Sequence, residues 1–509
     1  MNDAIVVTPQ PRRYPRHLVA EARTGRYAGR MEDGVLCFRS IEYAEQPVGD
    51  LRWKAPVQLK RSDEVHEAYA YGLTSIQPWR RRWSSSSRQG EDCLTLNVFT
   101  TALAPASPKA VMVWIHGGHG QWGGSIDPLD HGDNSVRRRD DVVVVTINYR
   151  LGHLGRLDVG RLGEGYGNAG NQALLDQIAA LEWIRDNIAA FGGDPGNVTI
   201  LGESEGAAAV AFLLVSPPAR GLFHRAVIQS GAQAYRRSND GLTASSLAIS
   251  DAVLDFLGVR TAAEAARVPE TELVEAANVF ERIDWLTRDG VALPYDPWAV
   301  LRDGGGARVP LMIGTNLDEE KLYGVFDDGY ASFADRKLDA WRRGNIISWG
   351  WEDPLEPHER AVAEDFLELH GGTVVEALSA FVTESTERLY AHRIADLHSA
   401  HAPVFFYSWE VPSAIPDLGA CHAVEIAYTL HNLDATIITG ARPDPRLAAA
   451  AHDAWVNFAV NGDPGGWPAY VPGERATMRF TPEGPIAELD PRAEERRLVV
   501  PLFSPYESR

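Results

Sequence analysis

The chain has 509 residues, of which 45% are hydrophobic and 23% are charged, a composition typical of globular proteins. Its formal net charge of −20 argues against a nucleic-acid partner and against an anionic membrane, because an acidic surface repels phosphate groups. No stretch of about 18 consecutive apolar residues occurs, so we expect no membrane-spanning segment.

Short apolar runs alternate with helical patterns along the chain. The predicted strands lie at 110–116, 141–148, 197–203, 225–231, 309–316 and 403–410. Nearly continuous apolar runs of this length are typical of strands buried on both faces of a parallel sheet. The predicted helices lie at 171–191, 205–216, 246–257, 261–283 and 446–461. This alternation indicates an α/β fold with a mainly parallel sheet flanked by helices.

Two stretches, at about 232–300 and 320–400, are rich in helical patterns and lack comparable strands. We interpret them as insertions that cover the functional edge of the sheet, because no linker rich in Pro, Gly or Ser separates them. The prediction is a single domain over 1–509.

The number of cysteines and the N-terminal segment are informative about the cellular compartment. Three cysteines, Cys37, Cys93 and Cys421, are too few for a disulfide framework and favour a reducing environment. The initial segment "MNDAIVVTPQPRRYPRH" has too short an apolar run for a secretory signal. We therefore expect a cytoplasmic protein.

The segment "ILGESEGAAA" (200–209) has the spacing G-x-S-x-G around Ser204, between a predicted strand and a predicted helix. This context is typical of a nucleophilic serine at a sharp turn. A serine hydroxyl is a weak nucleophile near neutral pH and needs a base that a third group orients. Downstream candidates are the acids of "GTNLDEEK" (314–321) and His422 in "GACHAVEIAY" (419–428).

A second motif, "HGGHG" (116–120), directly follows a predicted strand. Glycines let backbone N–H groups approach a ligand oxygen, and such donors stabilise the oxyanion of a tetrahedral intermediate. The alternative is an ordinary glycine turn.

Stretches that span most of the chain resemble the type-B carboxylesterase family and occur in the family's order. They include "YAEQPVGDLRWKAP" (43–56), "EDCLTLNVF" (91–99), "VMVWIHGG" (111–118), "NYRLGHLG" (148–155), "GNVTILGESEGA" (196–207) and "GACHAVEI" (419–426). The resemblance implies an α/β-hydrolase fold, a small-molecule ester as substrate, hydrolysis of carboxylic esters, and neither metal nor cofactor.

By position, the resemblance implies Ser204 as nucleophile, Glu319 as acid and His422 as base, with Asp318 as a competing acid. The oxyanion donors would be the backbone N–H groups of three further residues: Gly118, His119 and Glu205. The family normally has glycine at the position of His119, alanine at that of Glu205, and glycine where this chain has Glu320.

Two glutamates beside the serine leave alternatives open. Glu205 either points away along the new helix, or it pairs with the other unusual residue, His119. Glu203 either tunes His422 or makes only structural hydrogen bonds. The resemblance further implies buried ion pairs for Arg52 with Glu91 and for Arg150 with Asp176, and it leaves Cys93 without its usual cysteine partner, because Ser75 stands there.

Four aromatic residues lie in segments that line the substrate pocket in relatives, or else belong to core or surface: Trp79, Trp83, Trp122 and Tyr235. Three other functions stay open. The same triad serves an acyltransferase or cyclase, an esterase-like protein can be a non-catalytic binder, and His422-x-x-Glu425 has the spacing of two metal ligands, although a catalytic zinc site normally needs a third.

Overall fold

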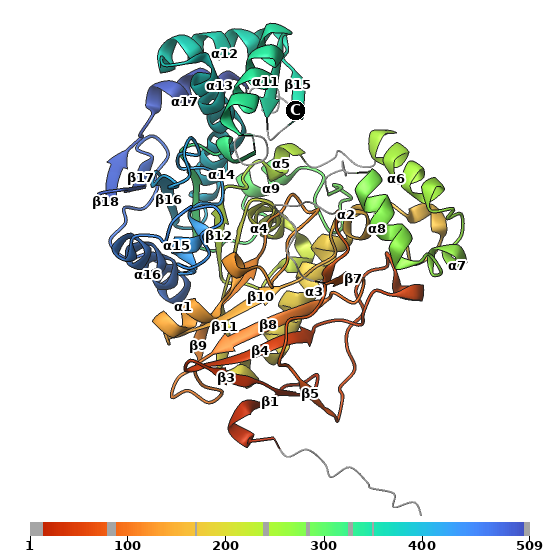
Figure 1. The fold of residues 1–509 in the computed structure, drawn as a ribbon. Coiled ribbons are helices and arrows are strands. Elements are labelled where there is room, and N and C mark those ends of the chain that lie inside the picture. Colours follow the sequence, from red (N-terminus) through yellow and green to blue (C-terminus); the bar gives the residue numbers. More distant parts are fainter. Residues whose placement is uncertain are drawn as a thin grey trace, which may run out of the picture.

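The computed structural model describes residues 14–78, 88–167, 170–237, 244–280, 286–323, 329–348 and 351–502 (Figure 1). Its centre is an 11-stranded sheet with the order β18-β17-β16-β13-β12-β11-β9-β10-β8-β4-β3. These strands are β3 (Arg30–Glu32), β4 (Val35–Glu42), β8 (Thr95–Thr100), β9 (Lys109–Ile115), β10 (Val142–Ile147), β11 (Gly193–Glu203), β12 (Arg225–Gln229), β13 (Leu311–Asn316), β16 (Val404–Trp409), β17 (Ala476–Thr481) and β18 (Gly484–Leu489).

The middle of the sheet is parallel and its two edges are antiparallel. All pairs from β10 through β9, β11, β12, β13 and β16 to β17 are parallel, whereas β8, β4, β3 and β18 pair antiparallel. Each of the six predicted strands is present within a few residues of its expected bounds. The mainly parallel α/β sheet predicted from the sequence is confirmed.

Two cores cover the two faces of the sheet, which explains why the strand sequences are almost wholly apolar. On β9, Val111 and Val113 belong to the core that contains α3 (Gln172–Asn187) and α4 (Glu205–Val215). The alternate residues Met112 and Trp114 belong to the core that contains α16 (Pro445–Asn461).

The predicted helices are present except for one, at 261–283. The structure there has two shorter helices, α7 (Ala262–Ala265) and α8 (Glu270–Val279). Pro269 stands between them with an extended ψ of 144°. Proline has no N–H to donate and disfavours helix in the residue before it, so a single helix cannot continue through this position.

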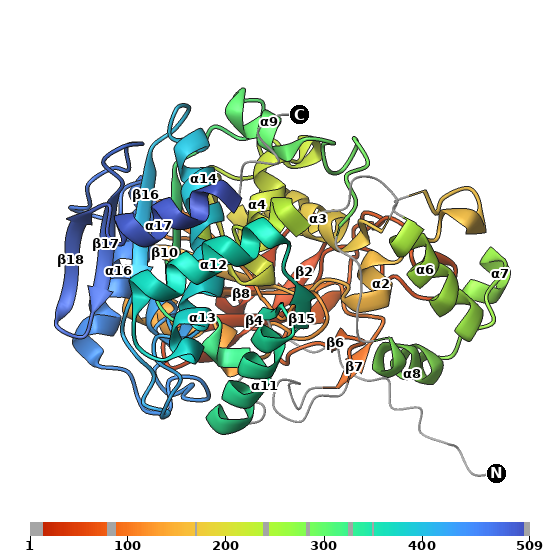
Figure 2. The ribbon, with the colours of Figure 1, turned by 90° about the horizontal axis from the view of Figure 1, so that it is seen from above.

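Both insertions are mainly helical and lie above the sheet in Figure 1, and Figure 2 shows them from above. The first contains α5 (Ala234–Arg237), α6 (Ala244–Phe256), α7, α8 and α9 (Pro297–Arg302). The second contains α11 (Tyr330–Arg342), α12 (Pro357–His370), α13 (Val374–Val382), a π-helical segment (Thr383–Arg388) and α14 (Leu389–His398). It also has an unpredicted hairpin of β14 (Asn345–Ser348) and β15 (Trp351–Pro354).

Smaller elements complete the described chain. They are β1 (Val19–Glu21), β2 (Arg26–Ala28), β5 (Val65–Glu67), β6 (Thr74–Ser75), β7 (Gln89–Gly90), α1 (Asp133–Arg138), α2 (Gly152–Arg156), α15 (Ile426–Thr429) and α17 (Ala493–Val499).

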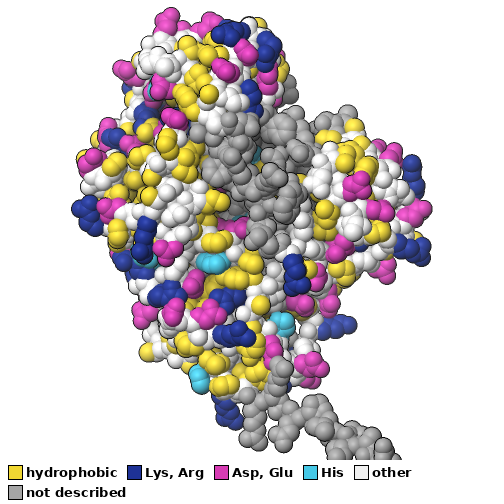
Figure 3. All heavy atoms as spheres, in the orientation of Figure 1, with side chains coloured by type: hydrophobic (Ala, Val, Ile, Leu, Met, Phe, Trp, Pro, Cys, Tyr) yellow, Lys and Arg dark blue, Asp and Glu magenta, His cyan; other side chains and the backbone are white. Residues whose placement is uncertain are grey.

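Two predicted ion pairs are buried: Arg52 lies 2.5 Å from Glu91, and Arg150 lies 2.7 Å from Asp176. On the described part of the face in Figure 3, acidic and basic side chains are interspersed. No helix among the described residues is both long enough and apolar enough to span a bilayer.

Candidate active site

Ser204 stands at a sharp turn between β11 and α4. Its backbone φ is 56°, in the left-handed region, and its N–H donates to the Gln229 carbonyl at the end of β12 (2.9 Å). Two glycines permit the turn: a Cβ on Gly206 would collide with the Ile115 carbonyl oxygen, and a Cβ on Gly202 would lie 2.5 Å from Gly206. A strained serine between a strand and a helix is the geometry of a nucleophile elbow.

The loop 116–120, which follows β9, lies against this turn. A Cβ on Gly117 would be 3.1 Å from the Cβ of Ser204. Gly118 and His119 have positive φ values of 102° and 54°, and the Gly118 carbonyl accepts hydrogen bonds from two N–H groups further along the loop. The loop therefore brings backbone close to the serine, which is the arrangement that an oxyanion site requires.

His422 lies between β16 and α15 in the chain and contacts the residue that precedes Ser204. Its Nδ1 lies 2.6 Å from Glu319 Oε2, and its backbone N–H donates to the Glu319 carbonyl (3.4 Å). Its Nε2 lies 3.0 Å from Oε1 of Glu203, the residue that precedes Ser204. Glu319 and His422 therefore form a carboxylate–imidazole pair beside the serine turn.

Asp318, the competing acid, has a different role in this loop. Its Oδ2 accepts a hydrogen bond from the Ala420 N–H (2.9 Å), and its Oδ1 lies 2.7 Å from the Lys321 ammonium. Asp318 thus fixes the backbone two residues before His422, while Glu319 contacts the imidazole itself.

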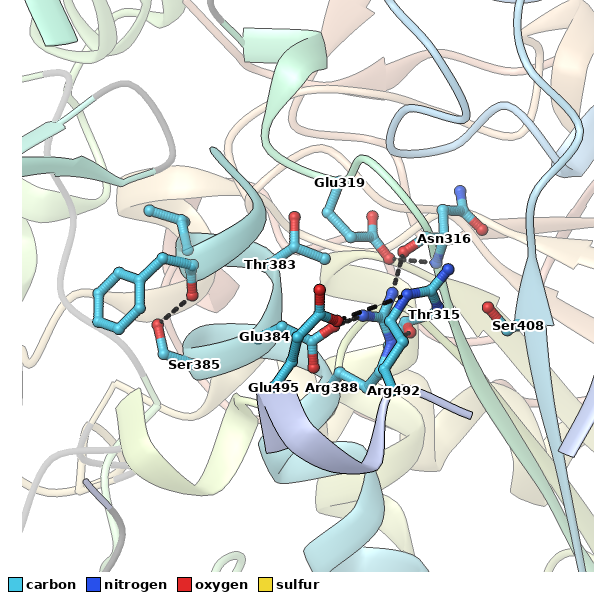
Figure 4. A network of polar contacts seen from close by, with 12 residues as sticks. Thr315, Asn316, Glu319, Thr383, Glu384, Ser385, Arg388, Ser408, Arg492 and Glu495 are labelled. Atoms are coloured by element: carbon cyan, nitrogen blue, oxygen red, sulfur yellow. Dashed lines mark hydrogen bonds and ion pairs between the residues drawn. The ribbon is translucent and has the colours of Figure 1, made fainter. Parts of the chain in front are cut away.

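The end of β13 is held by a buried polar network that sequence reasoning missed (Figure 4). The Asn316 N–H donates to Glu319 Oε1 (2.6 Å), and the Asn316 side-chain amide donates to Glu425 (2.6 Å). The Arg388 guanidinium donates to the Asn316 carbonyl (2.8 Å) and is ion-paired with buried Glu384. The Glu425 carboxylate and the Arg388 guanidinium therefore fix Asn316, whose N–H in turn holds Glu319.

Arg388 comes from the π-helical segment of the second insertion. Thr383, Ser385 and Thr386 donate their hydroxyls to carbonyls four residues earlier, at 3.1, 2.7 and 2.7 Å. These side-chain bonds satisfy carbonyls where the helix widens. Such π-helical turns are frequent at functional sites, and this one positions Arg388 against β13.

Glu203 is a buried acid among other buried acids. Burial, and then the neighbouring carboxylates of Glu425 and Glu319, raise its pKa well above the ordinary value. Glu425 is also fully buried, and its two oxygens accept from the side-chain amides of Gln229 (3.1 Å) and Asn316 (2.6 Å). Glu425 is therefore engaged by two side-chain amides, whereas His422 contacts Glu319. Over the described ranges, no group of three potential metal ligands occurs.

Neither sequence-based alternative for Glu205 describes its environment. The side chain is buried, so it does not extend into solvent, and its carboxylate is ion-paired with Arg156 at the end of α2. The His119 ring instead stacks on Trp122, with 5.2 Å between ring centroids. The expected pairing of Glu205 with His119 is therefore replaced by a pairing with a basic residue that the sequence analysis did not consider.

The candidate pocket aromatics lie in three different situations. Trp122 stacks on His119, next to the candidate oxyanion loop. Tyr235 is 1% exposed, packs edge-to-face on Trp298 and donates its hydroxyl to the Ala211 carbonyl on α4, as a core residue does. Trp79 and Trp83 lie outside the described residues.

Tyr323 is an aromatic residue at the site that the sequence analysis missed. Its ring lies 5.1 Å from that of His119 and 5.7 Å from that of His422. The sequence did carry a signal, because Tyr323 follows Glu319 by four residues, about one helical turn. Arg156 had a weaker signal, as a single charge between the apolar residues Leu154 and Leu157.

Comparisons with known proteins agree with this geometry. The model of the carboxylesterase family matches residues 17–497. The chain is 33% identical to the para-nitrobenzyl esterase of Bacillus subtilis, over 95% of this chain and 99% of that protein. It is also 33% identical to the phenmedipham hydrolase of Pseudarthrobacter oxydans, over 92% of this chain and 95% of that protein.

Solved structures show the same likeness. A carboxylesterase of Geobacillus stearothermophilus superimposes with a TM-score of 0.81 at 33% identity, covering 94% of this chain and 99% of that one. The structure titled PNB esterase superimposes with a TM-score of 0.79 at 32% identity, covering 95% and 100%. The resemblance predicted from the motifs is confirmed. By family model, sequence identity and fold, the chain belongs to the carboxylesterase family, carboxylic ester hydrolases with the α/β-hydrolase fold.

Proposed function

We propose that this chain hydrolyses carboxylic esters through an acyl-enzyme on Ser204, with His422 as general base and Glu319 as the acid that orients it. The observation that carries the proposal is the 2.6 Å contact between His422 Nδ1 and Glu319 Oε2 beside the serine turn. A proton on Nδ1 leaves the Nε2 lone pair available to take the serine proton, which is what the triad chemistry requires.

In the first step, Ser204 Oγ attacks the ester carbonyl carbon while its proton passes to His422 Nε2. The carbonyl oxygen becomes an oxyanion, for which we propose the backbone N–H groups of Gly118, His119 and Glu205 as donors. The intermediate then expels the alcohol, which takes the proton from His422. Water repeats the sequence on the acyl-enzyme and releases the acid.

Glu203 also lies at Nε2, and we propose that it acts as a neutral carboxyl group. Its raised pKa, caused first by burial, favours the protonated form. A neutral Glu203 places no second negative charge beside the imidazole, so the ionised partner of His422 during proton transfer is Glu319.

The proposed substrates are esters with an aryl or extended acyl group. The ring of His119, on the loop beside Ser204, lies 5.2 Å from that of Trp122 and 5.1 Å from that of Tyr323, and such rings offer flat surface for an aryl group. A para-nitrobenzyl esterase among the relatives is consistent with an aryl group. We also propose a cytoplasmic protein, on the support of three cysteines that are all buried and unpaired.

A fluorophosphonate probe followed by an ester panel tests the proposal. The probe should label the wild type at Ser204 and leave Ser204→Ala unlabelled. Removal of a triad nucleophile lowers turnover about a millionfold, so Ser204→Ala should hydrolyse no para-nitrophenyl ester measurably. Labelling of Ser204→Ala, or retained turnover, would contradict the assignment. Product analysis with an added alcohol separates hydrolysis from acyl transfer.

A further inference from the structure

A buried ion pair joins the residue after the candidate nucleophile to a helix beside the oxyanion loop. Glu205 is the first residue of α4 and Arg156 is the last residue of α2. Their side chains are each 5% exposed and are in direct contact through Arg156 Nη2 and Glu205 Oε1. Both charges are therefore removed from water, and Glu205 is compensated by Arg156.

The same guanidinium also lies against the oxyanion loop. A Cβ on Gly120 would overlap Arg156, so the loop can approach this closely only with glycine there. The Gly120 carbonyl accepts a hydrogen bond from the Gly152 N–H at the other end of α2 (2.7 Å). α2 therefore contacts the loop at both of its ends, and Arg156 stands between the loop and the start of α4.

An unpaired Glu205 would harm catalysis on electrostatic grounds. Its backbone N–H is a proposed oxyanion donor, so its side chain originates beside the developing negative charge. Two like charges about 5 Å apart at an effective dielectric of about 20 repel each other enough to slow the reaction about a hundredfold. That loss is as large as the contribution of one oxyanion-hole donor.

We propose that Arg156 is a positioning residue of the oxyanion hole. It neutralises Glu205 and seats loop 116–120 against the N-terminus of α4, so that donors from both segments converge on one oxygen. This inference rests on the proposed roles of Ser204 and the oxyanion hole. It assigns a function to Arg156, which takes no part in the proton transfers.

The experiment compares Arg156→Met, Glu205→Ala, the double variant and Arg156→Lys. Each variant and the wild type are titrated with the fluorophosphonate to count active sites. If the Ser204 assignment is wrong, the wild type itself will not be labelled at Ser204, so that failure is distinguished from a failure of the role of Arg156. The readouts are kcat, KM and the inhibition constants of an aryl trifluoromethyl ketone and its alcohol analogue. Ser204 Oγ adds to the carbonyl carbon of the ketone and creates an oxyanion there, whereas the alcohol analogue cannot form an oxyanion.

We expect Arg156→Met to lower kcat about a hundredfold while KM changes less than about threefold. The same variant should bind the ketone more weakly and the alcohol with unchanged affinity. The kcat of the double variant should be at least about tenfold higher than that of Arg156→Met, because the unpaired carboxylate is gone. Arg156→Lys, which keeps the charge, should lose less than about tenfold. Arg52→Met breaks the buried pair with Glu91 and should leave the ketone-to-alcohol preference unchanged.

Two results would overturn the proposal. One is a double variant as slow as Arg156→Met, since repulsion from Glu205 would then not be the cause. The other is equal weakening of the ketone and the alcohol, which indicates a general disturbance of the pocket. If Arg156→Met yields no folded protein, Arg156→Gln replaces it, and a ketone affinity equal in the Gln and Lys variants contradicts the proposal.

Discussion

The two halves of the candidate site are held in place by different means. On the nucleophile side, backbone contacts fix the geometry: the Ser204 N–H bonds to the Gln229 carbonyl, and Gly206 packs on the Ile115 carbonyl. On the acid side, buried side chains do so, with Glu319 bonded to Asn316 and Asn316 bonded to Arg388. The first half is confined to neighbouring strands, whereas the second depends on a remote insertion.

A second link ties the acid side to the same insertion. Glu320, which stands where the family has glycine, lies 2.9 Å from Lys337 on α11, and both side chains are almost fully buried. The Lys337 ammonium also donates to the Ile347 carbonyl on β14 (3.1 Å). The helices of the second insertion therefore support the segment that carries the acid, in addition to any role in covering the site.

The sharpest test of the acid side is Glu319→Gln. An amide cannot stabilise the imidazolium or enforce the required tautomer, so kcat should fall about ten-thousandfold. Asp318→Asn is the matched control, because Asp318 contacts Ala420 and Lys321, and kcat should fall less than about tenfold. Steady-state kinetics on a para-nitrophenyl ester measures both. If Asp318→Asn proves the slower variant, the acid has been misassigned.

On the nucleophile side the matching test is Gly206→Ala. The added methyl would collide with the Ile115 carbonyl oxygen, so α4 must shift away from β9. A displacement of about 1 Å at the serine costs about a hundredfold in kcat/KM, and overpacking destabilises the fold by about 1–3 kcal/mol. Gly167→Ala is the control, because a Cβ there meets no atom within 4 Å and the backbone φ is not positive. An unimpaired Gly206→Ala would show that the close approach of α4 to the Ile115 carbonyl does not fix this half.

The same contrast explains what the sequence could predict. Positions such as Gly202, Ser204 and Gly206 are constrained by their immediate backbone, and this leaves a short pattern that is readable in one segment. Arg388 lies 69 residues beyond Glu319 in the chain, and a buried arginine in a helix resembles any surface arginine in sequence. The strands and most helices follow local periodicity, but the contacts between remote charges have no local signal.

For the same reason the sequence does not predict the actual partner of Glu205. It leaves two alternatives open, a side chain that points away along the helix and a pairing with His119, the other residue that departs from the family pattern. Only the packing of α2 against the oxyanion loop brings Arg156 to Glu205. Proximity of this kind follows from the arrangement of elements in three dimensions.

The dependence of the acid side on its insertion is tested by Arg388→Met. Removing one partner of a buried pair leaves Glu384 uncompensated, so the free energy of unfolding should fall by about 3–5 kcal/mol. We expect kcat of the folded enzyme to fall about tenfold, because Asn316 loses its support. Arg343→Met removes an exposed pair with Glu352 in the same insertion and should leave the free energy of unfolding nearly unchanged, because water screens an exposed pair. If denaturant unfolding shows the same loss of unfolding free energy for Arg388→Met and Arg343→Met, the buried pair is no more important for stability than the exposed one.

The smallest effect expected concerns Glu203, where the two halves meet. Its carboxyl group touches His422 from the strand that carries Ser204, and burial with neighbouring carboxylates raises its pKa well above the ordinary value of 4.5. Because the proposed role is that of a neutral carboxyl, Glu203→Gln should change kcat by less than about tenfold, unlike Glu319→Gln.

The stability of that variant should depend on pH in a defined direction. Above about pH 4.5 the unfolded chain releases the Glu203 proton while the folded chain keeps it, so the wild type loses stability as pH rises. The amide in Glu203→Gln has no such proton to lose, and the Tm of this variant minus that of the wild type should increase between about pH 5 and pH 8. Glu368→Gln, exposed on α12, is the control and should show a constant difference. A difference for Glu203→Gln that stays constant between about pH 5 and pH 8 would mean that the folded protein also holds Glu203 ionised, and His422 would then have two carboxylate partners, one from each half of the site.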